Sequence, residues 1–302
     1  MVKSLVLENI SVGFKLPQGV FYAVDDVSLN LHGGNFTAII GESGCGKSVL
    51  GQAILNILPS GVVKKGRVLY NGEQVKKILS AFGIIPQNPS ESLNPVRKIG
   101  KQMQDILAVH NITDGDNSYK KQCLRLFGLQ EAERVLAAYP HELSGGMLQR
   151  VLCAMAVSSK PEWILADEPT KGLDEQVGAV VRKNLLTIKQ DLRLSMLIIT
   201  HDIALAQEVC DDVLVMYAGQ VLEHNADIWH KPLHPYTKGF LQALPKNGLQ
   251  VIPGKAPVPG ESFTGCKFAA RCPYCTMRCK EEMPAMQQVG NAEVRCFLYA
   301  EG

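Results

Sequence analysis

The sequence lacks any apolar run as long as the roughly 18 residues that a membrane-spanning helix requires. Residues 1–5 show neither the long apolar segment nor the cleavage site of a signal peptide. A strong charge of one sign is also missing, since 31 basic residues face 29 acidic ones and the net charge is +2. A spanning helix, a secretory leader and a polyanion-binding surface are therefore not expected. We expect a cytosolic chain that reaches a membrane only through a partner subunit.

Length and composition leave room for two domains. The chain has 302 residues with an apolar fraction of 46%, enough for a sizeable core, and about 150 residues per domain is the usual scale. Proline and cysteine become denser from about residue 231, where the periodicity of helices and strands fades. We therefore predict a main domain over residues 1–230 and a C-terminal extension over residues 231–302.

The stretch 41–48, Gly-Glu-Ser-Gly-Cys-Gly-Lys-Ser, follows an apolar run at 36–40 and precedes a predicted helix at 49–55. It matches the pattern G-x-x-x-x-G-K-[ST] in the strand, loop and helix context that phosphate binding needs, which disfavours an ordinary glycine-rich turn. Glycines let backbone N–H groups surround an anion, and the helix adds its positive N-terminal end. Lys47 can reach the outer phosphates, and the Ser48 hydroxyl can bind Mg²⁺. The predicted nucleotide-binding residues here are Gly41, Glu42, Ser43, Gly44, Cys45, Gly46, Lys47, Ser48 and Val49.

The region ahead of this loop predicts antiparallel hairpins, because three strand-like segments within residues 5–31 show alternating apolar residues. An aromatic side chain in this region can stack on the base of a nucleotide. Phe14 is the first candidate, followed by Phe21 and Tyr22. A plain core role is the alternative for each of them.

The rest of the main domain predicts an α/β fold. Short apolar runs at 82–87, 163–167 and 195–200 are separated by helical stretches, which is typical of a parallel sheet covered by helices. A helical pattern extends from about 92 to 155, so we predict an inserted helical subdomain there. One more hairpin is expected at 213–223.

Adjacent carboxylates, Asp167 and Glu168, follow the apolar run that begins at Trp163. Asp167 is placed to hold Mg²⁺, and Glu168 is placed to polarise an attacking water. Phosphoryl transfer depends mainly on positioning and charge stabilisation, which these two roles supply. A solvated Asp-Glu pair at the end of a strand is the alternative.

A second glycine-containing stretch, Ser144-Gly145-Gly146, lies just ahead of a predicted helix and makes a second phosphate-binding surface. One active site does not obviously need two such surfaces. A head-to-tail pair of nucleotide domains does, because each site then uses the phosphate loop of one domain and the Ser-Gly-Gly of the other.

In order and spacing, these motifs resemble the ATP-binding subunit of an ABC transporter over roughly residues 5–225. The matching features are the phosphate loop Gly41–Ser48, the Q-loop residue Gln87, the signature Leu143–Met147, the Walker B carboxylates Asp167 and Glu168, a D-loop at Gly172–Asp174 and the switch histidine His201. The resemblance implies a P-loop NTPase fold of the ABC ATPase type. Met147 replaces the usual glutamine of the signature, which leaves the phosphate contacts in place.

The same resemblance implies roles for these residues, with ATP and Mg²⁺ as the bound groups. Ser144, Gly145 and Gly146 would close on ATP bound by an opposing subunit. Gln87 would sense the γ-phosphate and couple to membrane subunits. The implied catalytic residues are Glu168, His201, Gln87 and Lys47, and the implied Mg²⁺ ligands are Ser48, Gln87 and Asp167.

The segments 234–238 and 241–245 are similar to the C-terminal extension of peptide and nickel importer ATPases, and residues 57–62 and 145–150 lean toward the nickel branch. The resemblance implies ATP hydrolysis coupled to import of nickel, a metal chelate or short peptides. The implied partners are a second, related ABC ATPase subunit, two transmembrane permeases and an extracytoplasmic solute-binding protein, with no nucleic acid. The implied location is the cytoplasmic face of the membrane.

Five of the nine cysteines crowd into the extension, with the spacing Cys266-x5-Cys272-x2-Cys275-x3-Cys279-x16-Cys296. In a cytosolic chain this indicates a metal site before disulfides, and four thiolates can hold zinc or an iron–sulfur cluster. Members of the peptide-importer group that share Cys266, Cys272, Cys279 and Cys296 imply a [4Fe–4S] cluster on those four, with Cys275 spare. Zinc and unligated thiols remain alternatives. Any metal here would staple a segment too short to build its own core.

Two other classes of protein share part of this pattern. A soluble ATP-driven clamp on nucleic acid or the ribosome shares the ATPase motifs, but the net charge of +2 and the single cassette disfavour it. A metal-storage or redox module would use the cysteines as its function and ATP as a regulator. Hydrolysis that survives replacement of the cluster cysteines would disfavour that module.

Overall fold

The structure is a computed structural model that describes residues 4–17, 19–74, 78–173, 175–244, 250–258 and 261–300. Its contacts divide the chain into two units, which are described separately. The first unit comprises Met1–Val2, His32–Phe36 and Lys76–Val209, and the second comprises Lys3–Leu31, Thr37–Val75 and Cys210–Gly302. The predicted boundary at residue 230 stays a prediction. Within the described ranges, no helix is both long enough and apolar enough to span a membrane.

The first unit contains parallel strands in which β7 pairs with β6 on one side and with β8 on the other. Their bounds are β6 Phe82–Ile85, β7 Trp163–Asp167 and β8 Ser195–Ile199. Every residue of β8 is buried, as expected of a continuous apolar strand in a sheet covered on both faces. The predicted parallel strands are thus confirmed.

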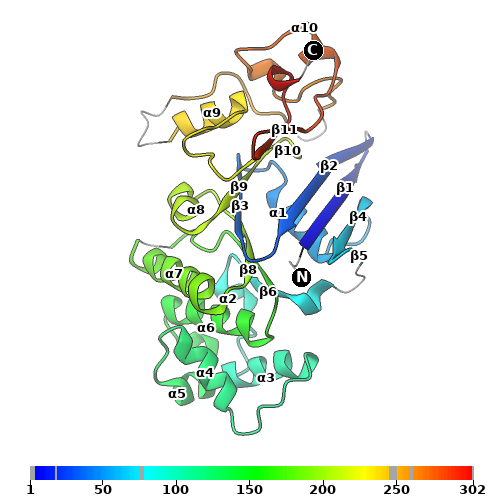
Figure 1. Cartoon of the computed structure of the whole chain (residues 1–302). Helices are drawn as coiled ribbons and strands as arrows, with labels where there is room; N and C mark the ends of the chain where they lie inside the picture. Colours follow the sequence, from blue (N-terminus) through cyan, green and yellow to red (C-terminus); the bar gives the residue numbers. More distant parts are fainter. Residues whose placement is uncertain are drawn as a thin grey trace. The chain divides into compact units, whose positions relative to one another are not determined.

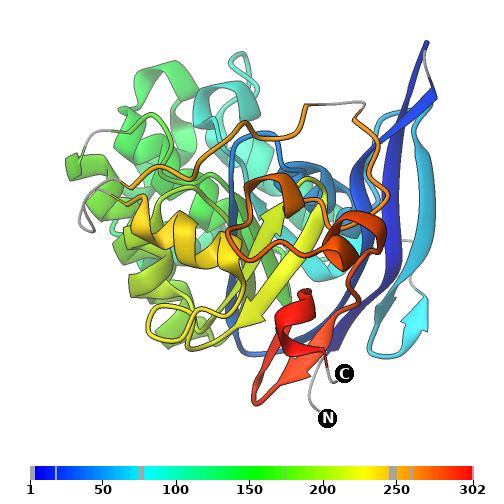
Figure 2. The same cartoon turned by 90° about the horizontal axis from the view of Figure 1, so that it is seen from above.

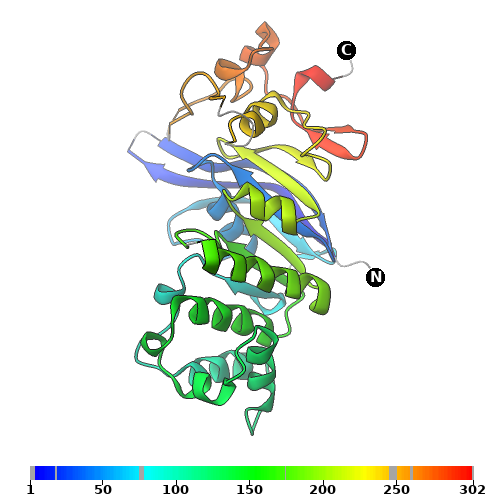
Figure 3. The same ribbon diagram turned by 90° about the vertical axis from the view of Figure 1, so that its left-hand side faces the viewer.

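The chain leaves β6 and reaches β7 only after a group of helices, α3 to α6, which gather at one end of the first unit (Figure 3). This confirms the predicted helical subdomain. The helices of the unit are α2 Pro89–Ser92, α3 Ile99–Val109, α4 Ser118–Leu126, α5 Ala132–Ala137, α6 Gly145–Ser158, α7 Glu175–Thr187 and α8 Ile203–Val209. Local chemistry sets their ends: the two carboxylate oxygens of Asp114 accept the N–H groups of Tyr119 and Lys120, at 3.0 and 2.9 Å, in the first turn of α4.

The second unit begins with an antiparallel sheet in the order β2-β1-β4-β5 (Figure 1). Its strands are β1 Ser4–Leu16, β2 Gly19–His32, β4 Val63–Tyr70 and β5 Glu73–Gln74. Two long strands replace the three short segments expected from the sequence. Asn9 and Asp26 take left-handed φ angles of 50° and 53° and hydrogen-bond to each other at 2.9 Å. They interrupt the alternation of side chains without ending the strands.

A second, mixed set of strands in this unit has the order β11-β12-β10-β9-β3. Strand β3 is parallel to β9, and β9 and β10 form the predicted hairpin. Strand β12 pairs with β10, so the C-terminal extension adds strands to the sheet of its own unit (Figure 2). The remaining bounds are β3 Phe36–Gly41, α1 Lys47–Leu55, β9 Asp212–Tyr217, β10 Gln220–Asn225, α9 Pro235–Gln242, α10 Met277–Glu281, β11 Gln287–Val289 and β12 Ala292–Val294.

Candidate nucleotide site and cysteine cavity

The predicted phosphate loop connects the fully buried strand β3 to helix α1. Gly41 and Gly46 have φ angles of 150° and 106°, in a region that favours glycine. A Cβ atom on Gly41 would lie 2.1 Å from the carbonyl oxygen of Met216, and one on Gly46 would lie 2.1 Å from that of Ala23. Both positions therefore require glycine, because a side chain would clash with the backbone of a neighbouring strand.

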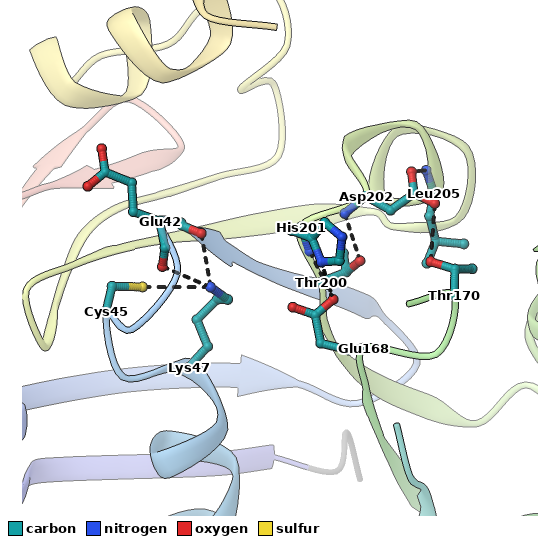
Figure 4. Close-up of polar contacts among 10 residues, drawn as sticks. Glu42, Cys45, Lys47, Glu168, Thr170, Thr200, His201, Asp202 and Leu205 are labelled. Carbon is teal, nitrogen blue, oxygen red and sulfur yellow. Dashed lines mark hydrogen bonds and ion pairs between the residues drawn. The ribbon is translucent and has the colours of Figure 1, made fainter. Parts of the chain in front are cut away.

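Lys47 is buried beneath this loop (Figure 4). Its Nζ donates hydrogen bonds to the carbonyl oxygens of Gly41 and Glu42 at 2.9 and 3.1 Å, and lies 3.9 Å from Cys45 Sγ. Ser48, the predicted Mg²⁺ ligand, is exposed at the start of α1. A buried ammonium group next to a helix N-terminus can bind an anion such as a phosphate.

A cavity of about 270 Å³ next to the loop is lined by Gly44, Gly219, Phe21 and Tyr22, among other residues. Phe14, the first candidate for base stacking, is half-buried on β1 and is not among the residues that line this cavity. The two aromatics ranked behind it lie closer to the phosphate loop in this sense. Which of the three stacks on a base stays a prediction.

In the first unit, Asp167 is the last residue of β7, and Glu168 follows it and lies beside His201 (Figure 4). Glu168 takes a left-handed φ of 49°, and its N–H donates to the Ile199 carbonyl at 2.8 Å. Its Oε2 lies 2.6 Å from Nδ1 of His201 and accepts the backbone N–H of His201 at 3.3 Å. The structure therefore brings together two of the predicted catalytic residues, Glu168 and His201.

The turn that carries His201 is held by a network around Asp202. The Thr170 hydroxyl donates to Asp202 Oδ2 at 3.2 Å, and the Asp202 N–H donates to Thr200 Oγ1 at 2.9 Å. The Leu205 N–H donates to Asp202 Oδ1 at 3.0 Å in the first turn of α8. These bonds fix the backbone next to the histidine, and the contact with Glu168 orients its ring.

The predicted signature residues lie at the N-terminus of the 14-residue helix α6. Ser144 caps the helix by accepting the N–H three residues on, at 3.4 Å, and both Ser144 and Gly145 are exposed. A Cβ on Gly145 would meet no atom within 4 Å, and one on Gly146 only a valine methyl at 3.9 Å, so this end of the helix is open to a ligand. Gln87 is exposed just beyond β6, and Asp174 lies outside the described residues.

Four of the five C-terminal cysteines line one cavity of about 180 Å³, and the fifth, Cys275, does not. The four are Cys266, Cys272, Cys279 and Cys296. Burial, and after it the neighbouring cysteines Cys279, Cys296 and Cys272, raise the pKa of Cys266 to about 11. The grouping is the one that the family resemblance singled out, and the role of these thiols as ligands stays a prediction.

The same cavity is lined by His234, which is 1% exposed. Its Nδ1 accepts the N–H of Tyr236 at 3.0 Å, while Nε2 is buried and has no hydrogen-bond partner among the described residues. Burial lowers the pKa of His234 to about 3, so the ring is neutral with its proton on Nε2. The neutral ring thus lines the cavity beside four thiols, with the backbone of Arg295 also acting on it.

Either occupant considered from the sequence, zinc or a cluster, must fit this cavity. Among the described residues, no group of three or more His, Cys, Asp or Glu side chains could hold a metal ion as they are placed. A hollow of about 180 Å³ is several times the roughly 30 Å³ that one water occupies. The volume leaves room for either occupant, a zinc ion or a cluster.

Sequence reasoning missed two residues that contact the phosphate loop, Arg271 and Tyr236. Both come from the extension, and both contact Glu42, from which they are separated by 229 and 194 residues of chain. Local patterns carry no signal for such distant pairs. Only the segment 234–238, noted for its family resemblance, marked one of them.

Comparison with protein-family models matches residues 24–171 to the family "ABC transporter" and residues 222–279 to "Oligopeptide/dipeptide transporter, C-terminal region". The chain is 34% identical to the oligopeptide transport ATP-binding protein OppD of Haemophilus influenzae, over 98% of either chain. It is 36% identical to the dipeptide transport ATP-binding protein DppD of Escherichia coli, over 95% of this chain and 94% of that one.

Two solved structures are similar over most of the chain. The structure of cbiO1 from Clostridium perfringens, part of an ABC transporter complex, has a TM-score of 0.61 and 26% identity, and covers 74% of this chain and 89% of that one. The dimeric, post-hydrolysis structure of the ATP-binding cassette MJ0796 with ADP and phosphate has a TM-score of 0.61 and 25% identity, and covers 73% and 97%. The predicted α/β fold is thereby confirmed.

Proposed function

We propose that this chain, which belongs to the oligopeptide and dipeptide transport group of ABC transporter ATP-binding proteins, energises the import of short peptides. It is an ABC-type ATPase that hydrolyses ATP to ADP and phosphate to drive import. The observation that supports a peptide cargo is the match to relatives named for oligopeptide and dipeptide transport, which covers nearly the whole of both chains. The nickel branch, toward which the sequence leaned, stays a prediction.

ATP binding is assigned to the phosphate loop, with the backbone N–H groups of residues 41–48 around the phosphates. Lys47 leaves its loop carbonyls for the outer phosphate oxygens, where its charge is neutralised. Ser48 is the proposed Mg²⁺ ligand on the phosphate loop, and Gln87 and Asp167 stay predicted ligands, because hydroxyl, carboxylate and amide oxygens suit this ion. When bound, Mg²⁺ supplies charge neutralisation for the phosphates.

Glu168 is assigned the orientation of the attacking water. Both of its contacts with His201 use Oε2, so Oε1 can accept a hydrogen bond from the water. A carboxylate accepts at Oε2, which places a proton on Nδ1 of His201. His201 is assigned contact with the γ-phosphate.

Ser144, Gly145 and Gly146 are assigned to ATP bound by an opposing ATPase subunit. Their exposed position at the N-terminus of α6 supports this, since backbone N–H groups there can bind phosphate. The opposing subunit is proposed to be a related but distinct ATPase. Two permeases and an extracytoplasmic solute-binding protein complete the proposed importer, with this chain at the cytoplasmic face of the membrane.

The cysteine cavity is proposed to hold a [4Fe–4S] cluster on Cys266, Cys272, Cys279 and Cys296. When bound, the cluster supplies a cross-link between four separate points of the extension. The neutral His234 ring, which lines the cavity, would donate its Nε2 proton toward a cluster sulfur. Zinc is the alternative occupant.

Glu168→Gln should abolish turnover while ATP stays bound, because the amide keeps the shape of the side chain and loses the carboxylate. We expect hydrolysis to fall by roughly 10²- to 10⁴-fold, the usual contribution of such a group. Trapped ATP should also strengthen dimerisation, which light scattering with MgATP measures. Glu175→Gln, an exposed glutamate in the same unit, is the control. Rapid turnover by Glu168→Gln would show that this residue does not orient the water.

Metal analysis of anaerobically purified protein should find about four irons per chain and broad absorption at about 400 nm, the signature of a four-cysteine cluster. Cys279→Ser should lose both, since a ligand is removed. Cys275→Ser should keep both, because that thiol lies outside the cavity lining. One zinc per chain and no visible absorption would contradict the cluster and identify the occupant of the cavity as a structural zinc ion.

Uptake of a radiolabelled dipeptide and of radioactive nickel should separate the two cargoes. In cells that express the complete importer, dipeptide uptake should fall to background with Lys47→Met, because phosphate binding loses its ammonium group. Nickel uptake should be unchanged by the same substitution. Nickel uptake that depends on Lys47, with dipeptide uptake unaffected, would overturn the proposed cargo.

A further inference from the structure

The phosphate loop carries a side chain, Glu42, that is held from outside the loop. Nη1 of Arg271 lies 3.0 and 3.2 Å from its two carboxylate oxygens. The Arg271 side chain is 7% exposed and the Glu42 side chain 26%. An ion pair at an open surface contributes little to stability. In this pair the arginine is buried, so removal of the glutamate carboxylate would leave a buried charge without its partner.

Arg271 is itself fixed before it meets the loop. Its Nε donates to the Pro253 carbonyl at 3.1 Å, and Nη1 also donates to the Tyr217 hydroxyl at 3.3 Å. The guanidinium lies over the rings of Tyr217 and Phe268, at 5.7 and 5.9 Å from their centroids. Little side-chain freedom is therefore lost when the guanidinium pairs with the carboxylate.

A second residue of the extension holds the backbone of the same glutamate. Tyr236, on α9, is fully buried and accepts the Glu42 N–H at its hydroxyl, at 3.1 Å. The Glu42 carbonyl accepts from Lys47 Nζ on the other side. Residue 42 is thus fixed at its N–H by Tyr236, at its carboxylate by Arg271 and at its carbonyl by the phosphate-binding lysine.

The two residues that contact Glu42, Arg271 and Tyr236, are each close in sequence to a residue that lines the cysteine cavity. Arg271 directly precedes Cys272, and Tyr236 is two residues from His234, whose ring lines the cavity. Phe268 lines the cavity and also packs against the rings of Tyr217 and Tyr236 at 5.4 Å. A change in the packing of the cavity therefore shifts the groups that hold Glu42.

We propose that Arg271 is a positioning residue for ATP binding, which fixes the phosphate loop through Glu42 and makes its affinity depend on the cysteine cavity. The proposal rests on the assignment of residues 41–48 as the phosphate loop, and not on the cargo. It makes the extension part of the nucleotide site, and it gives the cavity an influence on ATP affinity.

The test measures the dissociation constant of a fluorescent ATP analogue, with KM and kcat for MgATP, on the full chain. Arg271→Gln should raise both the dissociation constant and KM about tenfold and change kcat less than twofold, because the loop is misplaced while Glu168 and His201 are intact. Arg271→Lys should recover part of the loss. Glu42→Gln combined with Arg271→Gln should also recover part of it, since no charge is left unpaired. Thermal unfolding checks that each variant is folded.

Arg67→Gln is the matched control, because Arg67 pairs with Glu8 in an exposed ion pair of the same unit. It should leave ATP affinity within twofold of the wild type. Cys272→Ser should weaken ATP binding severalfold, and the double variant with Arg271→Gln should be no weaker than Arg271→Gln alone. Fully additive losses would contradict the dependence on the cavity.

Lys47→Met separates the two ideas. If it loses ATP binding while Arg271→Gln binds normally, the phosphate loop is correctly assigned and the positioning role of Arg271 is wrong. If Lys47→Met binds ATP as tightly as the wild type, the assignment of the phosphate loop itself fails.

Discussion

The conformation of the phosphate loop is determined at two glycines, where the loop backbone contacts the backbone of neighbouring strands. Gly41 and Gly46 have no side chain, and a Cβ on either would clash with the carbonyl oxygen of Met216 or Ala23. Those carbonyls belong to β9 and β2, so the loop is shaped by strands of its own unit and not by the nucleotide. The ammonium of Lys47 is buried against loop carbonyls in this arrangement, which prepares the site for phosphate.

The extension gains its stability from two sources. It pairs β12 with β10, and it packs the rings of Tyr236 and Phe268 against Tyr217 at the end of β9. Its cysteine-rich part is short and largely irregular, so a cross-link between separate cysteines would replace the core that it cannot build. Through Arg271 and Tyr236, the extension also contacts Glu42 in the phosphate loop of its own unit.

Much of the fold could be predicted because it depends on local patterns. The apolar run Trp163–Asp167 is β7 to the residue, and the phosphate loop lies between its predicted strand and helix. Most of β1 was predicted, by the segment 5–12, whereas β2 was predicted only in two pieces, because Asp26 takes a left-handed φ and interrupts the alternation between them. Base stacking could not be assigned either, since three aromatics within nine residues share one pattern.

The contacts of Glu42 with the extension lay beyond any local pattern. The pattern of a phosphate loop allows any residue at position 42, so the glutamate carries no signal. An arginine 229 residues further along the chain would ordinarily be interpreted as a surface charge. Only folding brings them together. The four cysteines were grouped from their family resemblance, and the cavity that they line supplies an independent reason to treat them as a set.

Hydrogen–deuterium exchange of the nucleotide-free full chain tests the central claim, that the extension fixes the phosphate loop, most directly. Peptides that cover residues 41–48 should exchange faster in Cys272→Ser than in the wild type, because the cavity no longer holds Arg271 against Glu42. Peptides that cover α4, in the other unit, should be unchanged. Equal exchange of residues 41–48 in both proteins would contradict the claim that the cysteine cavity and the phosphate loop are coupled.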